Sequence, residues 1–211
     1  MAPPLIAFDF DGTLTGGEMV VELAAEAGVR EEVSAISERA MRGEVDYATS
    51  LRERVSKLDG LELPAVVRAF DRIELRDDAA DTIATCRAAG TTVAVITGAF
   101  RRGVERALAA GGVTADIVIA NELVTVDGRL NGVVQGPLVD GTKDVALARC
   151  AEQVGCTPAE AVAVGDGAND IPMLRAAGTA IGVRPKPGVA EVCDHEVDTL
   201  RAVLPLAGVT R

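Results

Sequence analysis

The sequence predicts an α/β fold with a parallel sheet at its centre, and three observations support this prediction. From residue 77 onward, short apolar runs alternate with segments of helical periodicity. Residues 18–75, which follow the first apolar run, show helical patterns alone. One Asp-Gly pair, Asp127-Gly128, separates two strand-like runs. Alternation predicts a parallel sheet with right-handed crossovers, and the other two features predict an inserted helical unit and a small β-hairpin.

The first strand is the apolar run at residues 5–8, and a block of helices follows it. Four helical patterns, separated by glycines, lie at residues 18–27, 31–41, 47–58 and 64–71. Because this block interrupts an alternating chain, we expect residues 14–76 to form a helical cap inserted after the first strand. Residues 1–13 and 77–211 then form a Rossmann-like core.

Strands and helices alternate through the rest of the chain. The expected strands are residues 92–97, 117–120, 161–165 and 180–183. The expected helices are residues 77–89, 101–110, 142–154 and 170–177. The hairpin at residues 122–135 interrupts the alternation once.

Composition excludes several classes of function. The net charge of −11 argues against nucleic acid as a partner, because phosphate backbones are bound by basic patches. No apolar run approaches the roughly 20 residues that cross a bilayer, and the start of the chain lacks the basic end of a secretion signal, so we expect a cytoplasmic protein with no membrane partner. Four cysteines without CxxC spacing suit reduced thiols. Only three lysines occur among many Ala, Val, Asp and Glu residues, a composition typical of proteins of salt-loving microbes and also produced by a GC-rich genome.

Two carboxylates, Asp9 and Asp11, follow the first strand directly. Ligands bind at the carboxyl ends of the strands in open α/β sheets, so we expect both side chains at a binding edge. Two negative charges about 4 Å apart repel by roughly 4 kcal/mol at an effective dielectric constant near 20. We therefore expect a bound cation or a shared proton to offset the repulsion between the two carboxylates.

Other polar groups are expected at the same edge. Thr97 and Gly98 end the second core strand and offer a hydroxyl and a backbone amide to a phosphate. Lys143 opens a helix, where its ammonium and the free amides attract an anion. Since a lysine in a first helical turn opposes the helix dipole, we also expect an acidic neighbour or a ligand beside Lys143.

A second acidic turn completes the pattern. Asp166 and Asp170 lie in the run Gly-Asp-Gly-Ala-Asn-Asp, between a buried strand and a helix. With Asp9 and Asp11 they place four carboxylates at one sheet edge. A hard divalent cation resolves that repulsion, and Mg²⁺ prefers carboxylates, water and phosphate oxygens.

These four motifs, in this order and spacing, resemble those of the haloacid dehalogenase superfamily of aspartate-nucleophile phosphatases. The likeness to its phosphoserine phosphatases runs over nearly the whole chain and includes Glu18, the segment at residues 41–43 and the segment at residues 50–55.

The resemblance implies a covalent mechanism. Asp9 is then the nucleophile and Asp11 the general acid and base. Mg²⁺ is held by the Asp9 carboxylate, the Asp11 backbone carbonyl and the Asp166 carboxylate, with Asp170 behind them. The phosphate ligands are Thr97, Gly98, Lys143 and Asn169.

The resemblance also assigns substrate choice to the cap. Glu18 resembles the acid that pairs with the ammonium group of O-phosphoserine, and Arg54 the arginine that clamps its carboxylate. Met41 and Tyr47, the latter in place of a common phenylalanine, are expected to help seal the site or simply to pack the cap. The implied activity is hydrolysis of O-phosphoserine in the last step of serine synthesis, by a monomer or homodimer.

Two alternatives stay open at this point. One is a phosphatase or phosphotransferase of the same superfamily that acts on another small phosphomonoester. The other is a phospho-acceptor signalling domain, which also gathers acidic residues, threonine and lysine at the edge of a parallel sheet. The helical insert and the second carboxylate, Asp11, argue against signalling.

Overall fold

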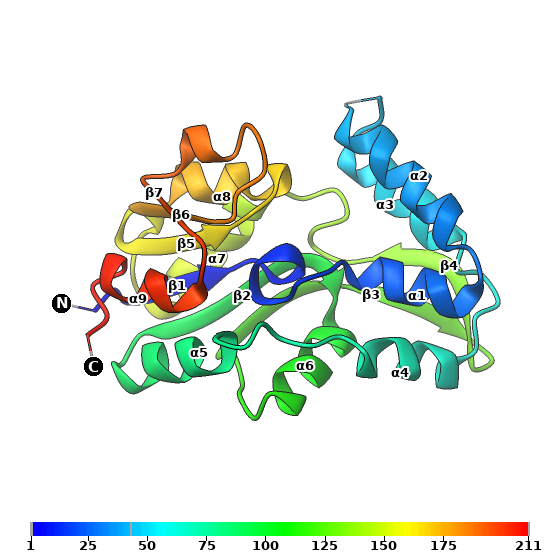
Figure 1. Ribbon diagram of the computed structural model, residues 1–211, viewed down its shortest axis with the longest axis horizontal. Helices are drawn as coiled ribbons and strands as arrows, with labels where there is room; N and C mark the ends of the chain where they lie inside the picture. Colours follow the sequence, from blue (N-terminus) through cyan, green and yellow to red (C-terminus); the bar gives the residue numbers. More distant parts are fainter. Residues whose placement is uncertain (1, 43, 211) are drawn as a thin grey trace.

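A computed structural model describes residues 2–42 and 44–210, except for the side chain of Met41. Within these residues the chain forms one seven-stranded sheet in the order β4-β3-β2-β1-β5-β6-β7 (Figure 1). All neighbouring strands are parallel except the antiparallel pair β3 and β4. The strands are β1 Leu5–Phe8, β2 Thr92–Phe100, β3 Ile117–Val126, β4 Arg129–Gln135, β5 Ala161–Gly165, β6 Thr179–Val183 and β7 His195–Val197.

The two faces of the sheet follow from alternation along β1. Ile6 and Phe8 pack into one apolar cluster, whereas Leu5 and Ala7 pack into another on the opposite face. The first cluster includes side chains of α5 Ala79–Ala88, α6 Arg101–Ala110 and α9 Val203–Leu206, and the second those of α7 Lys143–Val154 and α8 Ile171–Ala176. Because β1 is covered on both faces, every residue in it is apolar and buried.

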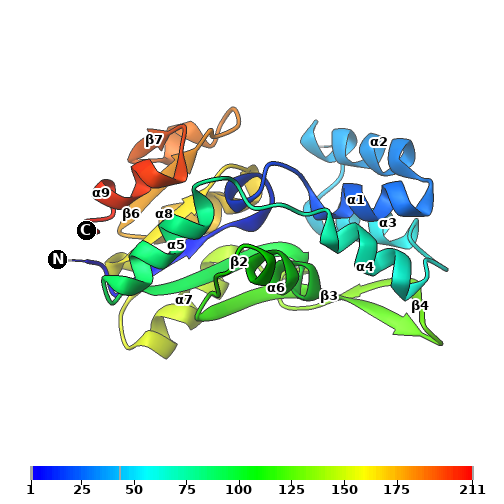
Figure 2. The same ribbon diagram turned by 60° about the horizontal axis from the view of Figure 1, so that its bottom comes forward.

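Four helices lie between β1 and α5 and gather at one end of the molecule (Figures 1 and 2). They are α1 Met19–Ala27, α2 Arg30–Met41, α3 Tyr47–Ser56 and α4 Leu63–Asp71. The chain leaves and re-enters the core through two adjacent segments, since Thr15 and Leu75 form an antiparallel bridge. The Arg76 guanidinium donates to the carbonyl oxygens of Gly12 and Thr13 and so ties the returning segment to the turn after β1.

The hairpin is a continuation of β3. The sequence predicted a strand at residues 117–120 and a separate hairpin, but β3 runs unbroken from Ile117 to Val126. Asp127 and Gly128, both with positive φ, make the turn into β4. The hairpin also binds the cap, because the Leu130 amide donates to the Leu61 carbonyl at 2.9 Å and Glu62 forms a bridge with Arg129.

Other predictions of strands and helices are confirmed within a few residues, with two differences. Strand β2 continues past Thr97 to Phe100, so the expected end of the strand at Thr97 was wrong. Strand β7 was not predicted, because its three residues carry two polar side chains and pair only with β6 at the edge. No helix in the described part of the chain is long and apolar enough to cross a membrane.

Phe70 of α4 anchors the cap on the core. It is 2% exposed and packs closely over Gly103 of α6, where an added Cβ would lie 2.8 Å from its ring. We expect Phe70→Ala to lower the free energy of unfolding by about 3–5 kcal/mol, because a large buried ring is lost and leaves a cavity. Urea unfolding measures this. Val133→Ala, at an exposed hairpin position, is the control and should change stability by no more than about 0.5 kcal/mol. Equal losses in the two variants would contradict the packing described here.

Candidate functional site

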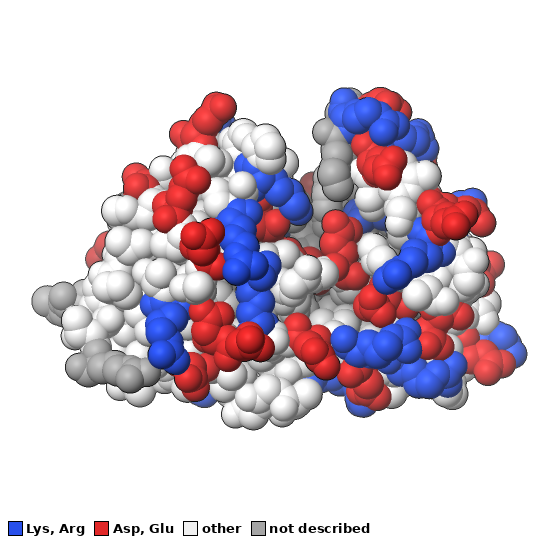
Figure 3. All heavy atoms as spheres, in the orientation of Figure 1, with Lys and Arg blue, Asp and Glu red and all other residues white. Residues whose placement is uncertain are grey.

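The predicted functional residues of the core meet at the carboxyl ends of the central strands. Asp9 directly follows β1, Thr97 lies near the end of β2, and Asp166 directly follows β5. Lys143 is the first residue of α7, which lies against β1 and β2. Figure 3 shows the surface hollowed between the core and helices α2 and α3, with acidic and basic side chains along the walls.

Lys143 lies between two buried carboxylates. Its Nζ donates to Asp170 Oδ1 at 2.6 Å and also contacts Asp9 Oδ1. The side chains of all three residues are at most 4% exposed. Burial acts to lower the pKa of Lys143, but the charges of Asp170 and Asp9 outweigh burial and raise it. The sequence predicted an acidic neighbour beside Lys143, and the structure places two there, Asp170 and Asp9.

The turn after β5 holds Asp170 in place. Asp170 Oδ2 accepts hydrogen bonds from the backbone amides of Asp166 and Gly167, both at 2.9 Å. A glycine at position 165 is needed, because a Cβ there would lie 2.6 Å from the Asp170 carboxylate. With Lys143 on its other oxygen, Asp170 has a protein partner for each carboxylate oxygen.

Asp166 has weaker partners. The Thr13 hydroxyl lies 3.5 Å from its Oδ1 and 3.4 Å from Asp9 Oδ2, so it joins the two carboxylates. Lys186 Nζ lies 3.0 Å from Asp166 Oδ2 but remains half exposed. Gly12, at φ +86°, leaves room for Asp166, since a Cβ there would lie 2.6 Å from the carboxylate. Asp166 is thus held near Asp9 with much of its hydrogen-bonding capacity unused.

Asp9, Asp166 and Asp170 form a buried acidic cluster, with one carboxylate oxygen of each within 4.8 Å of the others. Burial, followed by the charge of Asp170, raises the pKa of Asp9 to about 7. Burial also raises the pKa of Asp166. The cluster holds three carboxylates, whereas only two lysines, the buried Lys143 and the half-exposed Lys186, contact it among the described residues. Its negative charge is therefore not fully balanced. Their oxygen donors fit a hard divalent cation such as Mg²⁺.

Asp11 is suited to carry a proton. Its Oδ2 accepts a hydrogen bond from the Met19 amide at 3.2 Å, whereas its buried Oδ1 has no partner among the described residues. Burial, followed by the charge of Asp9, raises the pKa of Asp11 well above its usual value. The Met19 amide belongs to the first turn of α1, so Asp11 also links the turn after β1 to the cap.

Thr97 and Gly98 form a buried wall near the end of β2, the strand that pairs with β1. The Asn121 side chain braces this wall: its Nδ2 donates to the Gly98 carbonyl at 3.0 Å, and its Oδ1 accepts from the Leu138 amide at 2.9 Å. Asn121 is completely buried on β3. Asn121 was not among the predicted site residues. A polar residue at the end of an apolar strand segment could have indicated it. Asn169 lies exposed on the turn after β5.

The cap contributes a pair of opposite charges. Arg54 Nη1 lies 3.4 Å from Glu18 Oε2, and Arg54 Nε donates to the Ser50 carbonyl at 3.3 Å. Arg54 is 9% exposed. Glu18 and Arg54, which were predicted to bind the ammonium and the carboxylate of a substrate, thus lie side by side and pair with each other. The predicted role of Met41 concerns a side chain outside the described residues.

Lys186 was also missed. It lies between two prolines and was not among the predicted site residues. Its amide donates to the Asp166 carbonyl at 2.8 Å, and its ammonium reaches the Asp166 carboxylate. The left-handed backbone of Arg184, at φ +46°, bends this loop back toward the acidic cluster. The sequence offered one signal for Lys186, the position of its loop. The loop follows β6, which pairs with β5, and Asp166 directly follows β5.

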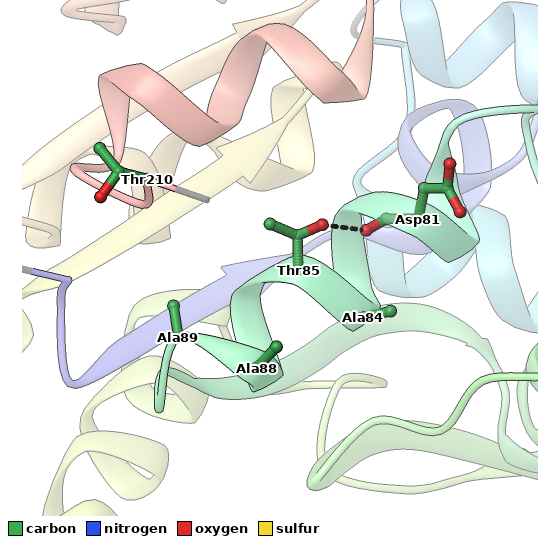
Figure 4. Close-up of a pocket in the computed structure, with 6 residues that line it drawn as sticks. All are labelled: Asp81, Ala84, Thr85, Ala88, Ala89 and Thr210. Atoms are coloured by element: carbon green, nitrogen blue, oxygen red, sulfur yellow. Dashed lines mark hydrogen bonds between the residues drawn. The ribbon is translucent and has the colours of Figure 1, made fainter.

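A shallow surface pocket of about 430 Å³ lies elsewhere, beside α5 (Figure 4). Its polar groups are few, and the Thr85 hydroxyl is already bonded to the Asp81 carbonyl within the helix. The pocket extends to Ala89, near the amino end of β2, so it is at the opposite end of the strands from Asp9. The acidic cluster, and not this pocket, has the groups needed for chemistry.

Comparisons with known proteins agree with the geometry. Residues 6–175 match the model of the haloacid dehalogenase-like hydrolases. The chain is 57% identical to a phosphoserine phosphatase of Halobacterium salinarum over 199 residues, which cover 94% of each protein. It is 46% identical to a phosphoserine phosphatase of Mycobacterium tuberculosis, over 98% of this chain and 51% of that one, so it spans about half the length of that relative.

Solved structures of phosphoserine phosphatases share the fold. One is a substrate-bound complex, 38% identical, with a TM-score of 0.90 over 98% of this chain and 99% of the other. A second, also 38% identical, holds an analogue of the phospho-aspartyl intermediate and gives a TM-score of 0.89 over the same shares. The predicted family and α/β fold are confirmed.

The raised pKa of Asp9 makes the stability of the metal-free protein depend on pH. In the unfolded chain the Asp9 carboxyl titrates near 3.8, and in the folded protein near 7. The protonated carboxyl therefore favours the folded state at low pH, and this contribution is lost as the pH rises through about 7. In EDTA, we expect the urea midpoint to fall between pH 5 and pH 8, and to fall less in Asp9→Asn. Parallel declines in the two proteins would show that Asp9 is not responsible.

Proposed function

The chain belongs to the haloacid dehalogenase-like hydrolases, and within them we propose that it hydrolyses O-phospho-L-serine to L-serine and phosphate. The observation that carries the proposal is that the Glu18 and Arg54 pair lies near the buried cluster of Asp9, Lys143 and Asp170. The charge of Glu18 acts on Asp11, and those of Arg54, Lys143 and Asp9 all act on Tyr47. The pair can bind an ammonium and a carboxylate, and the cluster can bind and cleave a phosphate ester. The Halobacterium and Mycobacterium relatives named above carry the same activity in their names.

Asp9 is the proposed nucleophile. Its carboxylate attacks phosphorus and displaces the serine oxygen, which gives an aspartyl phosphate and divides the transfer into two steps. Lys143 contacts Asp9 Oδ1 and keeps positive charge at the attacking carboxylate. Asp170 holds Lys143 from the other side and so fixes the direction in which the ammonium points.

Asp11 is the proposed proton carrier. In the first step its carboxyl protonates the departing serine oxygen. In the second step the carboxylate takes a proton from the water that hydrolyses the aspartyl phosphate. Its raised pKa keeps the proton available for the first step, and the unpartnered Oδ1 is free to face the substrate.

The proposed phosphate ligands are the Thr97 hydroxyl, the Gly98 amide, Lys143 and Asn169. Positioning and charge stabilisation supply most of the rate in phosphoryl transfer, so the rigidity of these groups matters. Thr97 and Gly98 are buried, and Asn121 braces the Gly98 peptide.

Mg²⁺ is the proposed cofactor, held by the carboxylates of Asp9 and Asp166 and the backbone carbonyl of Asp11. When bound, it would draw electron density from the phosphate oxygens and offset the carboxylate charge. The saturated hydrogen bonding of Asp170 supports a place for it behind the ligands, where it orients Lys143 and the turn after β5. Four free thiols in the described chain agree with a reducing compartment, and we propose the cytoplasm.

Arg54 is the residue proposed to select the amino-acid end of the substrate. We expect Arg54→Ala to lower kcat/KM for O-phospho-L-serine by at least about 100-fold, because a charged hydrogen bond and its geometry are lost. The kcat/KM for ethanolamine phosphate, which has no carboxylate, should change far less. Steady-state kinetics with both esters measures this.

Arg68→Ala is the matched control, since Arg68 is a cap arginine that pairs with Glu26 on the surface. It should leave both esters unaffected. A panel of other small phosphate esters and alcohol acceptors tests the alternatives within the family. The proposal fails if another ester is preferred to O-phospho-L-serine, or if Arg54→Ala affects both esters equally.

The two roles of Asp11 predict a burst in Asp11→Asn. An aryl phosphate such as p-nitrophenyl phosphate has a good leaving group that needs little protonation, so the first step should survive. The second step still needs a base, so its rate should fall by about 100-fold or more. Stopped-flow measurement should then show one equivalent of p-nitrophenolate released quickly, followed by slow turnover. Asp9→Asn should show no burst, and a burst there would refute its assignment as nucleophile.

A further inference from the structure

Tyr47 is a cap residue whose side chain reaches Gly98, in the wall formed by Thr97 and Gly98. A Cβ added at Gly98 would lie 1.7 Å from the Tyr47 hydroxyl oxygen. The hydroxyl therefore occupies the space that a side chain at position 98 would fill. Tyr47 is the first residue of α3, whereas Gly98 lies in β2, so this contact joins cap to core.

The direction of Tyr47 is set by the start of α3. Asp46 caps the helix, with its Oδ1 accepting from the Thr49 amide at 2.9 Å. Tyr47 and Arg54 are seven residues apart, which places them on one face of the helix. That face thus presents a hydroxyl toward Gly98 and a guanidinium toward Glu18.

Tyr47 as a whole residue is 37% exposed, but its hydroxyl, which has a proton to donate, lies against Gly98 of the core. Among the residues that the structure describes, the Tyr47 hydroxyl makes no hydrogen bond, although it lies near four charged groups: Lys143, Arg54, Asp9 and Asp11. Burial raises the pKa of Tyr47 to about 12, so the hydroxyl stays protonated at neutral pH. A donor placed among these charged groups is available to an acceptor that a ligand brings.

We propose that Tyr47 is a phosphate-binding residue of the cap, whose hydroxyl donates a hydrogen bond to a phosphoryl oxygen held at Gly98. The placement of a phosphoryl group at Gly98 rests on the proposed function. Because α3 carries the hydroxyl, the contact forms only when the cap lies over the core. Phosphate binding therefore favours cap closure through Tyr47. Binding of the amino-acid end of the substrate favours closure through Glu18 and Arg54.

Binding of inorganic phosphate and of L-serine separates this role from simple packing. Both are titrated calorimetrically into the Mg²⁺-loaded protein, as wild type and as Tyr47→Phe. We expect Tyr47→Phe to weaken phosphate binding by about tenfold or more, because a hydrogen bond to a charged acceptor is lost. The affinity for L-serine, which has no phosphate, should be unchanged. With O-phospho-L-serine, kcat/KM should fall by a similar factor.

Ser56→Ala is the matched control. It removes a hydroxyl from the same helix, where Ser56 Oγ donates only to the Glu53 carbonyl, and it should alter neither affinity. Unchanged phosphate affinity in Tyr47→Phe overturns the proposal. So does an equal loss for phosphate and L-serine, which would reflect cap packing. If the wild type binds phosphate but does not hydrolyse O-phospho-L-serine, the proposed function fails, while the phosphate titration still decides the role of Tyr47.

Discussion

The structure depends on one electrostatic constraint, the burial of several carboxylates at the edge of a parallel sheet. Asp9, Asp166 and Asp170 are buried within 4.8 Å of one another, and Lys143 alone supplies a fully buried positive charge between two of them. Such a cluster is stable only if every charge has a partner or a proton. The site meets this condition with one lysine, backbone amides on Asp170, a raised pKa on Asp9 and room for a cation.

The surrounding fold keeps that cluster rigid and covered. The acidic turns follow the apolar strands β1 and β5, and β2 between β1 and β3 carries Thr97 and Gly98. Asn121 and Arg76 hold the neighbouring backbone by donating to its carbonyl oxygens. The attachments of the cap to the core include the bridge between Thr15 and Leu75, the packing of Phe70, and the backbone bonds to the β3–β4 hairpin. A cap held in this way can exclude water from the phosphate and still present α3 to the ligand.

The core motifs were predictable because their chemistry is local. Asp9 and Asp166 each follow a strand, Lys143 opens a helix, and Thr97 lies near the end of β2. The carboxyl ends of parallel strands meet at one edge. Asn121 and Lys186 were missed because their function depends on neighbours in space. Asn121 acts through Gly98 and Leu138, and Lys186 through Asp166, none of which is close to it in sequence.

The sequence by itself determined the α/β class, the family and the order of the acidic motifs, because hydrophobic periodicity and turn residues are properties of short segments. Tertiary structure alone decided that β3 continues into the hairpin and that the Tyr47 hydroxyl lies against Gly98. It also decided that Asp170 has three short hydrogen bonds, whereas Asp166 has a long one from Thr13 and a half-exposed lysine. These are contacts between segments far apart in the chain, and they arise only when the core brings those segments together and burial makes each unpaired polar group costly.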